Sequence, residues 1–475
     1  MDVNGFRIEP GSNLKSANLK GANLAGVDLS GAILTDAILT DAILTDAILT
    51  DAILTQAELT AAVLTRSNLA YANVKDATLK DAGLSQANLT NTNLTNTNLK
   101  SANLITANLK GANLKSASLE GAYLMRASLF EANLEGANLT LAEMSFANLC
   151  DTNLIGTNLR NANLEGADLK GSNLKNADLS GANLSDADLS GADLSGANLT
   201  GANLHGVELS GSNFENTDLA GFNLAGFDLT GANLTGANLT GANLTDTELG
   251  GANLTGAKLT NAKLTGANLS GANLEHTDLA GFDLTDTNLT NAKLEGANLT
   301  GTNITNAKLT GANLSGANLT KAKLTGANLS GANLTGANLS NAILADINLI
   351  DSNLASVKLT GANLTNTNLT NANLEGAQLI RASLANTNLE RADLNHANLT
   401  HAILTDVHLE RANLTNANLT CAILTNANLT NANLTRAILT DTKLTASNIT
   451  GVSLKATYHA GISLTDVTGY EPFDD

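Results

Sequence analysis

An apolar residue recurs at every fifth position of this chain from Leu14 to Leu454, without insertion or deletion. We call this position the centre of a five-residue unit. It is leucine at all but five of its 89 occurrences, which hold Val74, Met144, Phe214, Ile304 and Ile449. A small residue, usually alanine, stands two places before the centre, and Asn or Asp stands directly before it. Thr, Ser or Lys follows the centre, then Gly, Asn or Asp, so the unit reads Ala-Asn-Leu-Thr-Gly.

A period of five fits neither a continuous helix nor a flat strand. Successive leucines would precess by about 140° around a helix and would alternate between the two faces of a strand. Alternation does hold within one unit, where the small residue and the leucine point inward while the Asn and the Thr point outward. A bend at the fifth residue restores the same inward face in every unit, and Gly, Asn and Asp suit such a bend. The chain must therefore coil, and repeats of this kind gain a core only by stacking.

Composition agrees with a narrow coil of small and aliphatic residues. Of 475 residues only 3% are aromatic, none is Trp, 41 are Gly and two are Pro, which argues against a mixed globular enzyme, collagen and a disordered tail. Cys150 and Cys421 are far apart and read as free thiols in a reducing compartment. No apolar run is long enough for a signal peptide or a membrane span, so we expect a cytoplasmic protein without a membrane partner.

Units such as Ala182 to Asp186 and Ala232 to Gly236 resemble the pentapeptide-repeat family, and the resemblance covers roughly residues 11–455. It implies an all-β fold, a right-handed quadrilateral β-helix or solenoid with four units per coil and with the centre and small residues inside. Residues 20 apart would then stack, and the 89 units would form about 22 coils and a rod of ~107 Å at a strand spacing of ~4.8 Å.

The two ends of the chain depart from the repeat. Residues 1–10 are expected to form an N-terminal cap, residues 11–455 the β-helix, and residues 456–475 a C-terminal cap or tail. The two prolines, Pro10 and Pro472, fall in these end segments, where no ladder hydrogen bond is lost. Caps of this kind block end-to-end strand pairing.

Four phenylalanines interrupt the inward pattern. Phe214 occupies a centre, whereas Phe222, Phe227 and Phe282 occupy the small-residue position. A ring in a space built for a methyl group overpacks the core. We expect a local bulge or a rearrangement of a neighbouring coil at these three positions; the alternative is a kink or an exposed aromatic anchor.

Five isoleucines replace the outward Asn in consecutive units near the start of the array. We call them the Ile collar: Ile33, Ile38, Ile43, Ile48 and Ile53. An apolar collar is a candidate contact site for a partner protein or for another copy of the chain, which would make a homo-oligomer. Recent duplication of identical units, with no role in binding, is the alternative.

Net charge raises the question of DNA mimicry, because some members of the family are acidic rods that imitate DNA and occupy the DNA-binding surfaces of topoisomerases. The chain carries a net charge of −18, and residues 11–455 hold 38 acidic and 25 basic residues. This is one charge per ~8 Å of rod against ~1.7 Å for duplex DNA. Between Lys175 and Lys258, however, there are ten acids and no Lys or Arg. Residues 176–257 would thus approach the DNA value at about one charge per ~2 Å.

Five acids lie 20 apart and would form a vertical column, which we call the acidic column: Asp168, Asp188, Glu208, Asp228 and Glu248. Carboxylates ~5 Å apart repel, so we expect some of their pKa values to be raised. Such a column would attract a basic protein surface or divalent cations. The alternative is a solvated face on which Asn, Asp and Glu interchange freely.

The sequence does not favour catalysis. His396, His401 and His408 form the only local histidine group, and outward side chains on a convex surface lack the concave pocket that catalysis uses. There is no phosphate-binding loop, and the scattered basic residues disfavour direct nucleic-acid binding. No cofactor or metal is expected.

The sequence predicts a non-catalytic, rigid protein-interaction or structural scaffold with an unidentified protein partner. The alternative is a partial DNA mimic that binds a nucleic-acid-binding enzyme through residues 176–257. Ice binding through stacked Thr is a third, weaker hypothesis.

Overall fold

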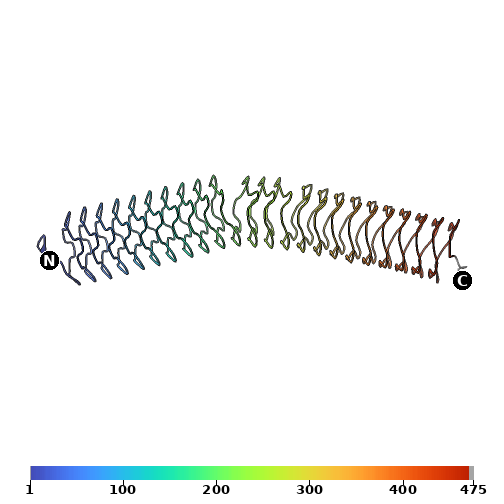
Figure 1. The fold of residues 1–475 in the computed structure, drawn as a ribbon, viewed down its shortest axis with the longest axis horizontal. Helices are drawn as coiled ribbons and strands as arrows, with labels where there is room; N and C mark the ends of the chain where they lie inside the picture. The colour runs from blue at the N-terminus through green and yellow to red at the C-terminus, as the bar shows by residue number, and fades with distance from the viewer. Residues whose placement is uncertain (1, 470–475) are drawn as a thin grey trace. The chain divides into compact units, whose positions relative to one another are not determined.

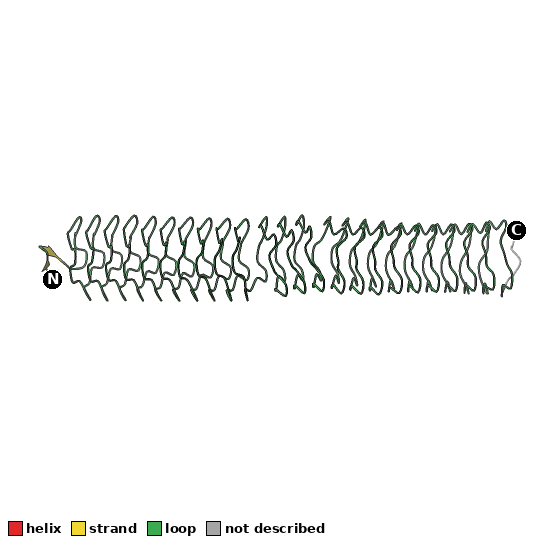
Figure 2. Ribbon diagram, turned by 90° about the horizontal axis from the view of Figure 1, so that it is seen from above, coloured by secondary structure: helices red, strands yellow, loops and turns green. Residues whose placement is uncertain are grey.

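The fold is a stack of short coils without a helix, as seen in a computed structural model that describes residues 2–469. The two strands longer than a single bridge are β1 (Asp2–Val3) and β2 (Phe6–Arg7), which pair antiparallel within the first ten residues. From there each five-residue unit contains one bridge residue and one turn, and the units wind into a stack of coils (Figure 2).

Each coil contains four five-residue units. Parallel bridges join outward residues that are 20 apart, beginning with Asn13 and Ile33 and ending with Asn448 and Thr468. Residues 20 apart are therefore neighbours in adjacent coils, as the resemblance implied. The bridges continue past residue 455, where the regular series of central leucines ends; residues 470–475 of the expected C-terminal segment lie outside the described residues.

The interior of each coil is filled by the central leucines and the small residues. Leu34 and Ala37 are both 0% exposed, and the same pattern recurs along the array. The bend residues adopt the left-handed conformation, with φ of 57° at Asp36 and 69° at Gly231. Bulky residues adopt it too, since Tyr71 has φ of 60°. The stack of bridges on either side thus fixes the bend even where the residue itself disfavours it.

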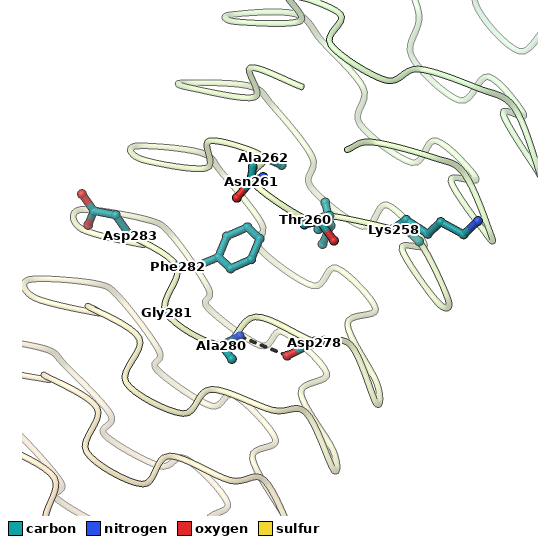
Figure 3. Close-up of a pocket in the computed structure, with 11 residues that line it drawn as sticks. Lys258, Thr260, Asn261, Ala262, Asp278, Ala280, Gly281, Phe282 and Asp283 are labelled. Carbon is teal, nitrogen blue, oxygen red and sulfur yellow. Dashed lines mark hydrogen bonds between the residues drawn. The ribbon is translucent and has the colours of Figure 1, made fainter. Parts of the chain in front are cut away.

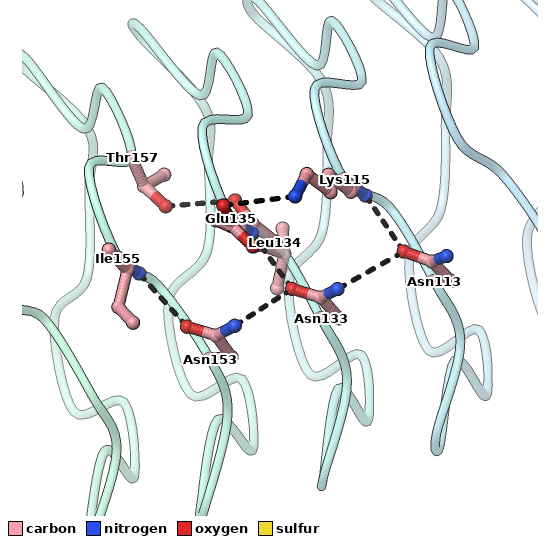
Figure 4. A network of polar contacts seen from close by, with 8 residues as sticks. All are labelled: Asn113, Lys115, Asn133, Leu134, Glu135, Asn153, Ile155 and Thr157. Carbon is pink, nitrogen blue, oxygen red and sulfur yellow. Dashed lines mark hydrogen bonds and ion pairs between the residues drawn. The ribbon is translucent and has the colours of Figure 1, made fainter.

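The outward asparagines form ladders of hydrogen bonds along the coils (Figure 4). The Oδ1 atom of Asn133 accepts from the backbone N–H of Glu135 at 3.1 Å and from Nδ2 of Asn153 at 3.0 Å. Its own Nδ2 donates to Oδ1 of Asn113 at 3.3 Å. One amide thereby closes the turn of its own unit and links three coils. Asparagine is frequent at this position for a structural reason, which the alternation of inward and outward residues did not reveal.

Threonine at the small-residue position also bonds between coils. The Oγ1 atom of Thr157 donates to the backbone oxygen of Leu134 at 2.9 Å (Figure 4). Thr92, Thr152 and Thr302 each make the same bond to the residue 23 places earlier. Hydroxyls buried at this position can therefore be satisfied by the backbone of the adjacent coil.

The chain divides into two compact units. The first comprises the chain up to Leu219 together with Ala232–Asn238, and the second comprises Ala220–Gly231 and the chain from Leu239 onward. Figure 1 shows successive coils lying side by side within each unit. Each unit has its own ladders and its own Leu and Ala interior.

Candidate interaction surfaces

Within the second unit, the ladder of backbone hydrogen bonds between adjacent coils is interrupted on two consecutive sides of one coil. No bridge joins Lys258 to Asp278 or Lys263 to Asp283 within residues 2–469, although each pair is 20 apart. The other two sides of the same level are intact, since Asn253 pairs with Asn273 and Asn268 pairs with Asn288. The segments 257–262 and 278–283 therefore face each other without the hydrogen bonds that join adjacent coils elsewhere in this unit.

A cavity of about 480 Å³ occupies this opening, and we call it the Phe282 slot (Figure 3). Its lining combines apolar groups with charged and amide side chains: Ala257, Lys258, Leu259, Thr260, Asn261, Ala262, Asp278, Ala280, Gly281, Phe282 and Asp283. The ring of Phe282 lies between the two coils in Figure 3. Ala257 is half-buried, whereas Ala252 in the preceding unit is 0% exposed.

Backbone groups on both sides of the slot lack partners. In the described part of the chain, no acceptor is found for the N–H groups of Gly256, Leu259, Asn261, Leu264, Asp278 and Asp283. One coil further on, the N–H of Leu279 donates to the oxygen of Asn298 at 2.8 Å and that of Gly281 to the oxygen of Thr300 at 2.9 Å. The slot thus interrupts a ladder that resumes immediately afterwards.

A buried hydroxyl next to the slot is also unsatisfied. Thr277 is 3% exposed, and its Oγ1 atom has no hydrogen-bond partner. At other coils several buried Thr at this position, among them Thr157 and Thr302, donate to the backbone oxygen 23 residues earlier. Ser172 Oγ and Glu410 Oε2 are the other buried side-chain atoms without a partner within residues 2–469. Thr277 directly precedes Asp278 of the slot lining, so its unsatisfied hydroxyl lies beside the opening.

The four phenylalanines are accommodated in two different ways. Phe214, at a centre, is 1% exposed, and bridges join Asn213 before it to the coils on both sides. Phe222, Phe227 and Phe282, at the small position, are half-buried. The core admits a ring in place of Leu but not in place of Ala, and at Phe282 room is made by opening the ladder to the preceding coil.

The acidic column is divided between the two units. Asp168, Asp188 and Glu208 are successive bridge partners in the first unit, whereas Asp228 and Glu248 are partners in the second. Of the ten acids between residues 176 and 257, seven belong to the first unit and three to the second.

The prediction of raised pKa values is wrong at Asp188. Nζ of Lys170 lies 2.6 Å from Oδ2 of Asp188. Partial burial is the largest influence on the Asp188 carboxyl and acts to raise its pKa, but hydrogen bonds from Lys170 and from the side chain and backbone of Ser190 hold the pKa below its usual value. The same ion pair raises the pKa of Lys170. The expected repulsion considered outward positions alone, whereas Lys170, two residues after Asp168, reaches the next coil with its side chain.

Other carboxylates in this region accept hydrogen bonds from asparagine. Nδ2 of Asn198 donates to Asp178 at 3.0 Å, and Nδ2 of Asn213 donates to Asp193 at 2.9 Å. An Asp can therefore stand 20 residues before an Asn without loss of the side-chain hydrogen bond between their coils. Where Asp follows Asp, as in Asp168 and Asp188, no such donor is available and Lys170 supplies the positive charge instead.

The Ile collar is exposed but distributed around the coil. Its five side chains are 36% to 41% exposed. Ile33, Ile38, Ile43 and Ile48 lie on four successive sides, and only Ile33 and Ile53 are bridge partners of each other. A partner that lies along one side would contact at most two of the five. This geometry offers less apolar contact than a flat patch of five isoleucines would.

A second exposed apolar group lies in the first unit and was missed at the sequence level. Tyr123, Leu141 and Phe146 are 45%, 56% and 57% exposed and belong to two adjacent coils. The guanidinium of Arg126 lies 6.0 Å from the centre of the Phe146 ring, at the limit for a cation–π contact. The departures that signalled it are an aromatic residue at an outward position and apolar residues at two consecutive bends.

The histidines and cysteines do not assemble into a reactive site. His396, His401 and His408 are exposed, and Nδ1 of His408 lies 3.3 Å from Oε1 of Glu410. Both cysteines are free, and burial, followed by the neighbouring Asp168 carboxylate, raises the pKa of Cys150 to about 12. Across the described residues no group of three or more His, Cys, Asp or Glu is arranged to hold a metal ion. Nor does this part of the chain contain a helix of the length and apolarity that a membrane crossing requires.

The coils, bridges and inward leucines define a repeat protein with a β-solenoid fold. The family model for pentapeptide repeats matches the chain in overlapping segments from residue 12 to residue 458, so the chain belongs to the pentapeptide-repeat family. Members of this family form right-handed quadrilateral β-helices and are generally non-enzymatic structural or interaction proteins.

Solved structures similar to this chain include several proteins of the same kind. HetL from the cyanobacterium Nostoc, a pentapeptide repeat protein involved in heterocyst differentiation regulation, is 31% identical over 52% of this chain and 89% of its own, with a TM-score of 0.24. The fluoroquinolone resistance protein QnrB1 is 16% identical over 40% of this chain and 91% of its own, with a TM-score of 0.25. Rfr23 from the cyanobacterium Cyanothece is 35% identical over 23% of this chain and 62% of its own, with a TM-score of 0.09. Among curated proteins no match to the chain was found.

Proposed function

We propose that the protein is a non-catalytic, rigid scaffold of about 22 coils that holds a protein partner in the cytoplasm. The observation that carries this proposal is the outward asparagine ladder, in which single side chains such as Asn133 are fixed by bonds to two neighbouring coils. Side chains that are already ordered lose little freedom when a partner binds, which favours recognition over a long regular surface.

The scaffold function is tested by immobilising the folded chain and capturing proteins from a lysate of the source cells at low and at high salt. The scaffold function is supported by a partner that stays bound to the immobilised chain at high salt and is displaced when free chain is added. The control is the heat-unfolded chain, which should not retain that partner. If folded and unfolded chain retain the same proteins, the scaffold function is rejected.

A second candidate function is partial DNA mimicry, in which residues 176–257 bind a nucleic-acid-binding enzyme. It is supported by the seven acids that this segment places in the first unit without an intervening Lys or Arg. Two observations limit it: the last three acids belong to the second unit, and the ion pair with Lys170 neutralises part of the charge of the column.

DNA mimicry is tested by replacing outward acidic residues with Asn, the residue usual at that position. The triple variant Asp178→Asn, Asp188→Asn and Asp193→Asn keeps the acceptor that closes each turn while it removes three charges. The mimic predicts weaker capture of the partner by this variant and a steep loss of wild-type binding as salt increases. The matched control removes three outward acids elsewhere through the substitutions Asp28→Asn, Glu143→Asn and Asp393→Asn. Equal binding by both triple variants contradicts the mimic.

A further inference from the structure

We propose that the Phe282 slot binds an extended peptide segment of a partner protein, which completes the interrupted ladder between residues 257–262 and 278–283. The proposal rests on the scaffold function, because it names the kind of contact by which one partner is held. It concerns the second unit alone.

Two strand edges face each other across the slot with unpaired backbone groups. Within residues 2–469, Leu259, Asn261 and Asp278 each present an N–H without an acceptor. In an intact coil the equivalent groups pair with the adjacent coil, as Leu279 does with Asn298. An extended peptide carries donors and acceptors in the same alternation and can bond to both edges, which is how strand addition gives affinity.

The hydroxyl of Thr277, which is 3% exposed, has no hydrogen-bond partner among residues 2–469. A buried hydroxyl without a partner is destabilising. Thr277 directly precedes Asp278, whose backbone N–H also lacks an acceptor in this part of the chain. A bound peptide would bring a backbone oxygen to this strand edge, where both groups need an acceptor.

The charged side chains on the two edges of the slot favour a peptide over other ligands. Lys258 lies on one edge of the slot and Asp278 and Asp283 lie on the other, and none of the three belongs to an ion pair within the described residues. Elsewhere an ion pair does form between neighbouring coils, as between Arg66 and Asp46. A peptide with an acidic and a basic side chain complements both edges. A cavity of about 480 Å³ lies within the ~300–1,000 Å³ range of ligand sites.

Phe282 keeps the slot open and gives it an apolar wall. Its ring lies between the coils, and its backbone oxygen still accepts from the N–H of Asn303 at 2.8 Å, so the coil that follows is undisturbed. Alanine is usual at this position in other units. The substitution Phe282→Ala should therefore let the two coils pair, close the slot and leave the fold intact.

The test uses the full chain and a defined probe. The probe is a fluorescein-labelled peptide of two repeat units, Ala-Lys-Leu-Thr-Gly-Ala-Glu-Leu-Thr-Gly, because units of this kind pair with adjacent coils throughout the protein and its Lys and Glu complement the charges of the two edges. Anisotropy should show binding to the wild type and binding at least about tenfold weaker to Phe282→Ala, since several backbone hydrogen bonds are lost together. The control Phe214→Leu also removes a ring but belongs to the first unit, and it should bind as the wild type does.

Amide hydrogen exchange locates the bound probe. The N–H groups of Leu259 and Asp278 should become protected when the peptide binds, while that of Leu279 should not change. Three results would each overturn the proposal that the slot binds a peptide. They are no binding by the wild type at millimolar peptide, equal binding by Phe282→Ala, and no protection of the Leu259 amide. Capture of a lysate partner that is unaffected by Phe282→Ala, together with absent peptide binding, rejects the slot while the scaffold function stands. If the peptide binds but no partner is captured from the lysate, the scaffold function is rejected and peptide binding by the slot is retained.

Discussion

At the scale of the residue, the outward asparagine determines how well each coil is joined to the next. Its Oδ1 closes the turn that follows and its Nδ2 bonds to the previous coil, as Asn133 shows. Asp keeps the first of these bonds but lacks the second donor, and Ile makes neither. The Ile collar therefore replaces a hydrogen-bonded surface by an apolar one whose turns are held by the backbone alone.

Asn133 offers a graded test of this role. We expect Asn133→Ala to lower the free energy of unfolding by about 1–3 kcal/mol, because the N–H of Glu135 and the amide of Asn153 lose an acceptor. Asn133→Asp should cost less, since the acceptor remains. Denaturant unfolding of both variants measures the difference. Equal destabilisation by Ala and Asp would show that the Oδ1 bonds do not matter.

Lys170 provides a test of the electrostatics in the acidic column. Replacing it in Lys170→Gln removes the ion pair, so the pKa of Asp188 should rise. In the wild type this pKa is lowered from 3.8, so the stabilisation by Asp188 is present above about pH 3.8 and is lost as the pH falls through the lower folded-state value. A nuclear magnetic resonance titration of the Asp188 carboxyl measures the shift.

The matched control is Lys175→Gln, which removes a nearby lysine that forms no ion pair within the described residues. It should leave the Asp188 titration closer to that of the wild type. Identical titration curves for the wild type and Lys170→Gln would contradict the assignment of the low pKa to this ion pair.

At the scale of the element, the coil tolerates a change of its centre better than a change of its small residue. Phe214 replaces Leu and stays buried within an intact ladder, whereas Phe282 replaces Ala and the ladder to the preceding coil opens. The small side chain is buried beside the packed leucines in the narrow interior of the coil. The added volume is therefore accommodated by separation of the coils.

The open ladder should be visible in hydrogen exchange of the free protein. Among residues 2–469 the amide of Leu259 has no acceptor, while the equivalent amide of Leu279 is bonded to Asn298. We therefore expect Leu259 to exchange faster than Leu279, and Phe282→Ala to bring the two rates together. Equal protection of the two amides in the wild type would mean that the ladder is closed at this level.

Two buried threonines test the same opening from the interior. The substitution Thr277→Val removes a hydroxyl without a partner and should leave stability unchanged or raised. Thr302→Val removes a hydroxyl that donates to the oxygen of Leu279 at 2.8 Å and should destabilise by about 1 kcal/mol. Thermal unfolding of the two variants measures the contrast. A larger loss at Thr277 would show that its hydroxyl is bonded.

Sequence alone predicted which residues face inward but not how the outward residues bond. The period of five required a coil, and the resemblance to the family supplied the register of 20 that the bridges show. The Phe282 slot was signalled by the ring itself, but the extent of the opening depends on which of its neighbours gives way. The effect of Lys170 on Asp188 was missed because the two residues are 18 apart and come together only in the diagonal contact between coils.

At the scale of the whole molecule, nearly every inward position is used for the same Leu and Ala core, so specificity must reside in departures on the surface. The first unit carries most of the acidic segment, the Ile collar and the exposed group around Phe146. The second unit carries the Phe282 slot. Distinct surfaces on one regular framework are what a scaffold with more than one contact requires.

The four-unit coil makes residues 20 apart neighbours, and cysteine cross-linking tests that relation directly. With Cys150 and Cys421 replaced by Ser, the pair Asn313→Cys and Asn333→Cys should form a disulfide on mild oxidation, because these positions are bridge partners. The pair Asn313→Cys and Lys323→Cys, which is 10 apart and on opposite sides of a coil, should remain reduced. A disulfide in the second pair and none in the first would contradict the four-unit coil on which the account rests.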